Sequence, residues 1–153
     1  MATQIFDNIR AVRTKIAAQL EGFTTEQLNR IPEGLNNNLV WQLGHLVVAT
    51  EMLCYWRSGA MKERAVPLAD NYRNGSKPEA FVPETEIAML KERFFSSIDT
   101  LEAFYTEGAL TVAEPFALGT FGIPANNMDE LLQMCLWHDT LHWGNINVIR
   151  KLV

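Results

Sequence analysis

Hydrophobic residues recur at three- and four-residue steps along most of this chain, and that spacing gathers them on one face of an α-helix. Between Thr3 and about Glu21, five apolar positions keep the spacing: Ile5, Ile9, Val12, Ile16 and Leu20. Gly22 ends this first predicted helix. Thr24 and Gln27 lie three residues apart and predict a capping box, which opens a short second helical turn.

The next predicted helix runs from about Leu39 to Arg57, with Asn38 as its N-cap and a stop near Gly59. Its apolar residues go most of the way round the helix. A helix of this kind is usually central in its fold, or contacts another subunit as well as its own core. Its apolar breadth is therefore one reason to expect a homodimer.

Two further helices are predicted, from about Glu84 to Glu107 and from about Asn127 to Leu152. Both begin with acidic residues, which favour the positive end of the helix dipole: Glu84, Glu86, Asp129 and Glu130. The last helix also closes with two basic residues at its negative end: Arg150 and Lys151.

Two stretches lack a sustained period and read as long connections: residues 59–82 and the segment ALTVAEPFALGTFGIPANN. The second has room for a short strand or a lid. A long connection is what two helices need in order to run parallel. Four amphipathic helices with long connections predict an all-α four-helix bundle, in which residues 1–153 form a single domain.

Composition and charge narrow the class of protein. The net charge is −5, and the 13 basic residues are scattered, so nucleic acid is not an expected partner. The N-terminal residues include charges that a signal peptide lacks, and no apolar run is long enough for a membrane span. We expect a cytoplasmic protein whose two cysteines, Cys54 and Cys135, are small buried thiols kept reduced.

The candidate chemistry lies in the three histidines. His138 and His142 are four residues apart on the last predicted helix, so both imidazoles project from one face and can reach one ion. His45 lies in the middle of the second long helix, where Gly44 beside it lets a neighbouring segment or a ligand come close. Buried imidazoles need a hydrogen-bond partner or a metal. A single buried histidine is more often a hydrogen-bonded core residue, but this triple favours a metal site.

Two alternatives concern the residues around these histidines. His138-Asp139-Thr140-Leu141-His142 invites comparison with the HExxH zinc peptidases, but only eleven residues follow His142, which is too few for a ligand from a later helix. The peptidase interpretation is therefore weak. Cys135 lies one turn before His138 and is a less favoured fourth ligand, whereas Cys54 is expected to face away from His45.

With these residues in view, the segments VWQLGHLVVATEML and WHDTLHWGNINVIRKL resemble the DinB-like superfamily of metal-binding four-helix bundles. That superfamily includes bacillithiol transferases and mycothiol-dependent isomerases. The resemblance implies that His45, His138 and His142 are the metal ligands, and it implies a homodimer with a pocket beside the metal. Asp139 stands where the family usually has Glu, and Asn145 where it usually has Gln.

Three histidine ligands leave coordination positions open for water or substrate, as in a catalytic site. We expect a divalent ion at the three histidines, zinc or nickel. The resemblance favours a thiol-dependent S-transferase that acts on small electrophiles and takes a low-molecular-weight thiol. A metal-dependent hydrolase and a non-catalytic dimeric module that binds a metal or ligand are the alternatives. Asn145, one turn beyond His142, is the predicted hydrogen-bond partner of that histidine or of a water at the ion.

Overall fold

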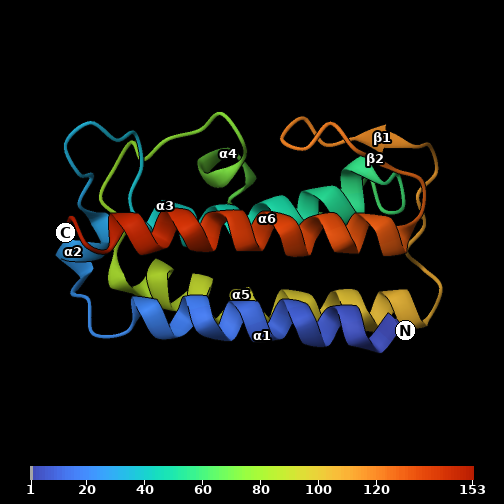
Figure 1. Ribbon diagram of the computed structural model, residues 1–153, viewed down its shortest axis with the longest axis horizontal. Coiled ribbons are helices and arrows are strands. Elements are labelled where there is room, and N and C mark those ends of the chain that lie inside the picture. The colour runs from blue at the N-terminus through green and yellow to red at the C-terminus, as the bar shows by residue number, and fades with distance from the viewer. Residues whose placement is uncertain (1) are drawn as a thin grey trace.

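The computed structural model describes residues 2–153 and contains four long helices (Figure 1). They are α1 (Ala2–Leu20), α3 (Leu39–Glu51), α5 (Glu84–Thr106) and α6 (Met128–Ile149). Helix α3 continues without a break into a π-helical segment, η1 (Met52–Arg57). Helix α1 packs against α5 and α6, and α3 packs against the same two helices from the other side. The predicted all-α helical bundle is confirmed, and its helix ends lie within three residues of the predicted ones.

Short elements occupy the connections. Helix α2 (Thr25–Asn29) begins with the predicted capping box, in which the Thr24 hydroxyl accepts from Gln27 and the Gln27 side chain accepts from the amide of Thr24. Helix α4 (Ala69–Tyr72) interrupts the first long connection. Strands β1 (Phe116–Ala117) and β2 (Pro124–Ala125) form an antiparallel pair in the second connection, where the sequence left room for a strand.

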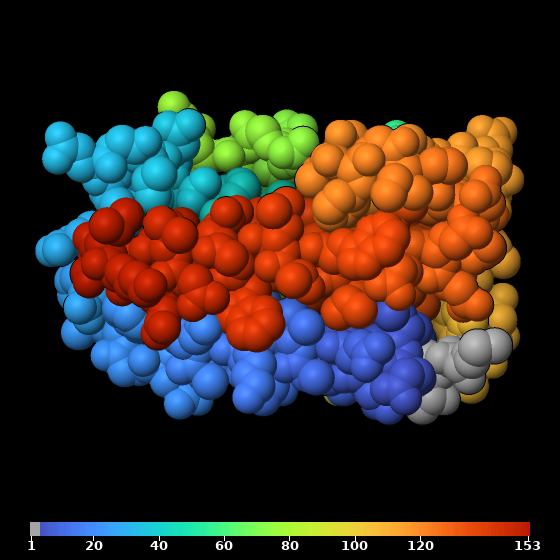
Figure 2. All heavy atoms as spheres, in the orientation of Figure 1, coloured from blue at the N-terminus to red at the C-terminus, as the bar shows by residue number. Residues whose placement is uncertain are grey.

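The two long connections lie along one side of the bundle. In Figure 2 their residues, green and orange, border α6 along its upper edge. Helix α4 contacts α3, and β2 contacts α6. The connections therefore cover the side of the bundle on which α3 and α6 meet.

Helix α3 is central, as predicted. All of its residues except Ala49 are buried, because α5, α6, α4 and α2 surround it. Its apolar breadth is accounted for inside a single chain. The homodimer therefore stays a prediction that no longer depends on this helix.

The core also contains one charged pair. Arg13 of α1 has no exposed surface and donates from Nε to Oδ2 of Asp139 on α6 at 2.8 Å. Its other nitrogens donate to the Phe94 carbonyl at 2.6 Å and to the Thr50 hydroxyl at 2.9 Å. Arg13 thus links all four long helices through one guanidinium group.

Helices long and apolar enough to cross a membrane are lacking in the described part of the chain.

Candidate metal centre

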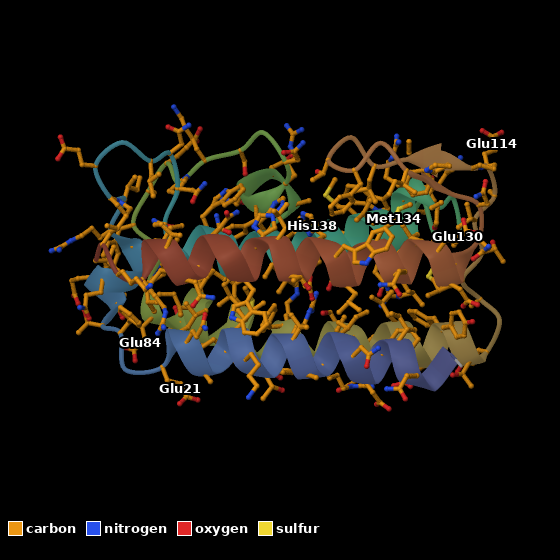
Figure 3. All side chains as sticks on the ribbon, viewed as in Figure 1. Glu21, Glu84, Glu114, Glu130, Met134 and His138 are labelled. Atoms are coloured by element: carbon orange, nitrogen blue, oxygen red, sulfur yellow. The ribbon has the colours of Figure 1, made fainter. Side chains whose placement is uncertain are left out.

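The three histidines come together where α3 crosses α6. His45 projects from α3, and His138 and His142 project from adjacent turns of α6; Figure 3 labels His138 on that helix. One ring nitrogen from each lies within 4.8 Å of the other two. Nε2 of His45 and Nε2 of His138 are 3.3 Å apart. The sequence predicted this grouping from the four-residue spacing and the position of His45.

A backbone carbonyl orients His45. Its Nδ1 donates to the carbonyl oxygen of Tyr72 at 2.7 Å, which leaves Nε2 free to point toward the other imidazoles. Gly44 makes this contact possible, because a Cβ at that position would lie 2.4 Å from the Tyr72 ring. The prediction that Gly44 admits a neighbouring segment is correct, and the segment is α4. Trp41 stacks on the His45 ring, with ring centroids 4.7 Å apart.

A side-chain amide orients His142. Its Nδ1 donates to Oε1 of Gln42 at 2.6 Å, and Nε2 of Gln42 donates in turn to Oδ1 of Asn37 at 2.9 Å. This chain of hydrogen bonds holds the His142 ring with Nε2 directed inward. The predicted partner, Asn145, does not make this contact; it lines the pocket beside the histidines.

The electrostatics favour neutral imidazoles, which is the form that binds metals. Burial lowers the pKa of His138 to about 3, and repulsion from Arg13 and from the protonated forms of His142 and His45 adds to that effect. Burial and the charge of His45 lower the pKa of His142 to about 4. The pKa of His45 is also lowered, mainly by burial, although its bond to Tyr72 opposes the change.

The separation of one nitrogen pair fits a tetrahedral ion. Two nitrogens at about 2.05 Å from a zinc ion, with the tetrahedral angle between them, lie about 3.3 Å apart. Nε2 of His45 and Nε2 of His138 show this separation. Within residues 2–153, no Cys, Asp or Glu joins the three histidines at ligand distance. The three imidazoles could hold a divalent ion, and all three also line the pocket described below.

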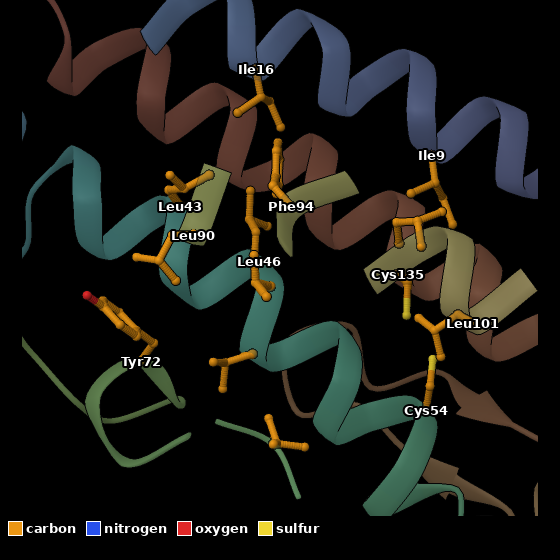
Figure 4. Packing of buried hydrophobic residues seen from close by; sticks show 14 of the residues in the cluster. Ile9, Ile16, Leu43, Leu46, Cys54, Tyr72, Leu90, Phe94, Leu101 and Cys135 are labelled. Carbon is orange, nitrogen blue, oxygen red and sulfur yellow. The ribbon is translucent and has the colours of Figure 1, made fainter. Parts of the chain in front are cut away.

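Cys135 is not positioned as a ligand. Figure 4 shows the side chains of Cys54 and Cys135 directed toward each other in the core. Their hydrogen bond, together with burial, raises the pKa of the Cys135 thiol well above its ordinary value. A thiol that stays protonated is a poor metal ligand.

Asp139 points away from the pocket. It has no exposed surface, and its Oδ2 accepts from Arg13 in the core. Burial raises the pKa of Asp139, and the charge of Arg13 opposes that rise. A peptidase general base at this position would have to reach a water at the ion. Asp139 cannot do so, and this removes the basis of the peptidase interpretation.

A cavity of about 700 Å³ opens beside the imidazoles. Its walls come from α3, η1 and α6, and the residues of the β1 turn close it from the side of the second connection. Apolar side chains form much of its surface, among them Trp41, Met52, Leu53 and Leu141. The cavity is large enough for a small organic molecule next to the ion.

Sequence reasoning missed two residues that shape the site. Gln42 precedes His45 by three residues, so both lie on one face of α3, and the single amide side chain in this mostly apolar helix was the available signal. Arg13 follows Ile9 by four residues and thus falls on the apolar face of α1. A charged residue on a core-facing stripe indicates a buried partner.

Comparison with known protein families gives a match over most of the chain. The family model described as the DinB superfamily matches residues 8–146, a range that includes all three histidines and both members of the buried ion pair. A search of curated proteins found no match.

Proposed function

Because the chain belongs to the DinB superfamily, we propose that it is a metal-dependent transferase that joins a low-molecular-weight thiol to a small electrophile. The observation that carries the proposal is the cavity of about 700 Å³ that opens directly onto three inward-facing imidazoles. His45, His138 and His142 would hold the ion through imidazole nitrogens, which are suitable ligands for zinc or nickel. When bound, the ion would acidify a coordinated thiol so that it reacts as a thiolate at neutral pH.

The residues around the pocket favour a thiol over water as the nucleophile. Hydrolysis generally needs a positioned base to take the proton of water. Among the described residues that line the pocket, none is Asp or Glu, and Asp139 is held by Arg13 in the core. A thiol has an unperturbed pKa of about 8.5 and can lose its proton to solvent without such a base.

The proposed reaction conserves atoms and charge. The thiol releases its proton to solvent, and its sulfur attacks an electrophilic carbon. A carbon–sulfur bond forms, while the bond from that carbon to its leaving group breaks and the leaving group departs with the electron pair. Gln42 and the Tyr72 carbonyl keep the histidine rings in place, and Trp41 and Met52 shield the reacting atoms from water.

Cobalt substitution tests the thiol step directly. Protein loaded with Co(II) would be titrated with 2-mercaptoethanol, and with ethylene glycol as the oxygen counterpart. We expect a sulfur-to-cobalt charge-transfer band with the thiol only, and its loss in the His138→Ala variant. A spectrum that stays unchanged on addition of the thiol would rule out thiolate binding at this site.

Catalytic turnover is tested with the same thiol and a small electrophile. The zinc- or nickel-loaded protein should accelerate thioether formation between 2-mercaptoethanol and 1-chloro-2,4-dinitrobenzene above the rate of the chelator-treated protein. Thiol binding without any acceleration would favour the alternative of a non-catalytic binding module.

A cytoplasmic homodimer is part of the proposal. The buried thiols of Cys54 and Cys135 suit a reducing compartment. Trp137, Leu141 and Val148 lie on one face of α6 and are 41%, 45% and 58% exposed, which offers an apolar surface to a second copy. Light scattering should give twice the mass of the chain, and a monomeric mass at micromolar concentration would contradict the dimer.

A further inference from the structure

The pocket beside the histidines contains one permanently cationic side chain, Arg57. The chain as a whole carries 18 acidic residues and a net charge of −5, yet the described residues that line this pocket include no carboxylate. The local charge is therefore opposite in sign to that of the whole protein. A bound divalent ion would make the pocket more positive still.

The π-helical segment η1 brings Arg57 to the pocket. Arg57 follows His45 by twelve residues, so an uninterrupted α-helix would place it roughly 120° round the axis from the histidine. The wider turns of η1, where the amide of Ser58 bonds to the carbonyl of Leu53 five residues earlier, rotate Arg57 back toward that face. Short π-helical segments of this kind are frequent at functional sites.

Arg57 is held by an aromatic ring and not by an acid. Its guanidinium lies 4.9 Å from the centre of the Phe116 ring on β1. Stacking on a ring fixes the plane of the guanidinium while its N–H groups remain free along the edge. Within the described part of the chain, no carboxylate lies within ion-pair distance of Arg57, whereas Arg10, Arg13 and Arg93 each have at least one such partner.

We propose that this pocket selects ligands that carry a carboxylate, and that Arg57 binds that carboxylate through two parallel N–H···O bonds. The inference deepens the proposed function, on which it rests for the position of the ligand's other end at the histidines. Asn74 and Thr120 add uncharged hydrogen-bonding groups to the wall of the pocket. The preferred thiol is then an acidic one.

The distance between the histidines and Arg57 limits the length of the ligand that can reach both. Twelve residues of helix span at most about 18 Å, and the arginine side chain reaches back over part of that distance. An extended tripeptide spans about 10 Å. A ligand of tripeptide size, with sulfur near its middle or one end and a carboxylate at the other, fits these limits and the cavity of about 700 Å³.

Calorimetry with a thiol-blocked ligand tests this inference independently of thiolate binding. The probes are S-methylglutathione, which carries two carboxylates, and its dimethyl ester, which carries none. They would be titrated into the metal-loaded wild-type protein at low salt. We expect the diacid to bind at least tenfold more tightly than the ester, because a hydrogen bond to a charged group contributes at least that factor.

Two variants test whether Arg57 causes the difference in affinity between the diacid and the ester. Arg57→Met should reduce the affinity for the diacid at least tenfold and leave the ester unchanged. Arg64→Met is the matched control, because Arg64 also stacks on aromatic rings, those of Tyr55 and Phe104, but lies outside the pocket. It should bind both probes like the wild type.

The outcomes separate the two proposals. Equal binding of the diacid and the ester to the wild type would overturn the carboxylate inference, whatever the variants do. Equal losses of affinity for the diacid in Arg57→Met and Arg64→Met would also overturn it, because the loss would then come from the change in net charge and not from a contact with Arg57. The 2-mercaptoethanol titration contains no carboxylate, so its failure would reject thiolate binding alone.

Discussion

The ion pair between Arg13 and Asp139 gives the sharpest test of what stabilises this bundle. We consider the replacement Arg13→Met, which keeps much of the apolar stem and removes the guanidinium. Three hydrogen bonds shorter than 3.0 Å would be lost, to Asp139, the Phe94 carbonyl and Thr50. The Asp139 carboxylate would remain in the core without its partner, and its Oδ1 already has no hydrogen-bond partner in the structure.

The expected cost follows from the burial of both groups. Removing one member of a buried ion pair typically costs 3–5 kcal/mol, because the remaining charge is uncompensated. We therefore expect Arg13→Met to lower the free energy of unfolding by about 4 kcal/mol. For a chain of this length, that corresponds to a melting temperature about 10 °C lower. Replacing both residues, as Arg13→Met with Asp139→Leu, should cost less than the sum of the single changes.

Urea unfolding followed by circular dichroism would measure these changes, on metal-loaded and on chelator-treated protein. Arg10→Met is the matched control on the same helix, because Arg10 is partly exposed and pairs with Asp99 at the surface. Arg10→Met should lower the free energy of unfolding by less than about 1 kcal/mol. Equal effects of Arg10→Met and Arg13→Met, or strict additivity in the double variant, would refute the reasoning.

Three further predictions concern the site. In chelator-treated protein, His138 and His142 bind protons only on unfolding, since their folded pKa values of about 3 and 4 lie below the unfolded value of about 6.5. Stability present above pH 6.5 should thus fall on acidification by about 2 kcal/mol per histidine between pH 7 and pH 5, as measured by urea midpoints, and a flat profile would contradict these pKa values. Gly44→Ala should displace the Tyr72 ring, which a Cβ would approach to 2.4 Å, and weaken metal affinity about tenfold in chelator competition; unchanged affinity would mean that the Tyr72 carbonyl does not orient the site. Cys135→Ala should leave the metal stoichiometry unchanged by elemental analysis, and a loss of metal would reassign the ligand set.

Much of this architecture could be predicted from periodicity alone. The long helices bury their stripes against each other, so the three- and four-residue spacing carries most of the information about the fold. The grouping of His138 and His142 likewise follows from helix geometry. His45 joined them in the prediction because it lies at the centre of the most apolar helix, which had to occupy the middle of the bundle.

Other features depend on tertiary contacts that no local pattern records. The bond from His142 to Gln42 joins residues 100 positions apart, so local spacing pointed to the nearer Asn145 for this contact; its alternative role, at a water on the ion, stays a prediction. The pairing of Arg13 with Asp139 spans 126 positions. The change from α3 to η1 at Met52 has no signal in the apolar spacing, since the hydrogen bonds change while the composition does not.

The bond between His45 and the carbonyl oxygen of Tyr72 has a consequence for how such a protein can diverge. Every amino acid carries the same carbonyl group, so the hydrogen bond to the imidazole restricts only the path of the main chain, while the Tyr72 ring on Gly44 helps to fix that path. The connection between η1 and α5 can then accumulate substitutions, and with them new ligand preferences, while metal affinity is maintained. An alignment of sequences would register this support only indirectly, through Gly44, the residue that makes room for the Tyr72 ring.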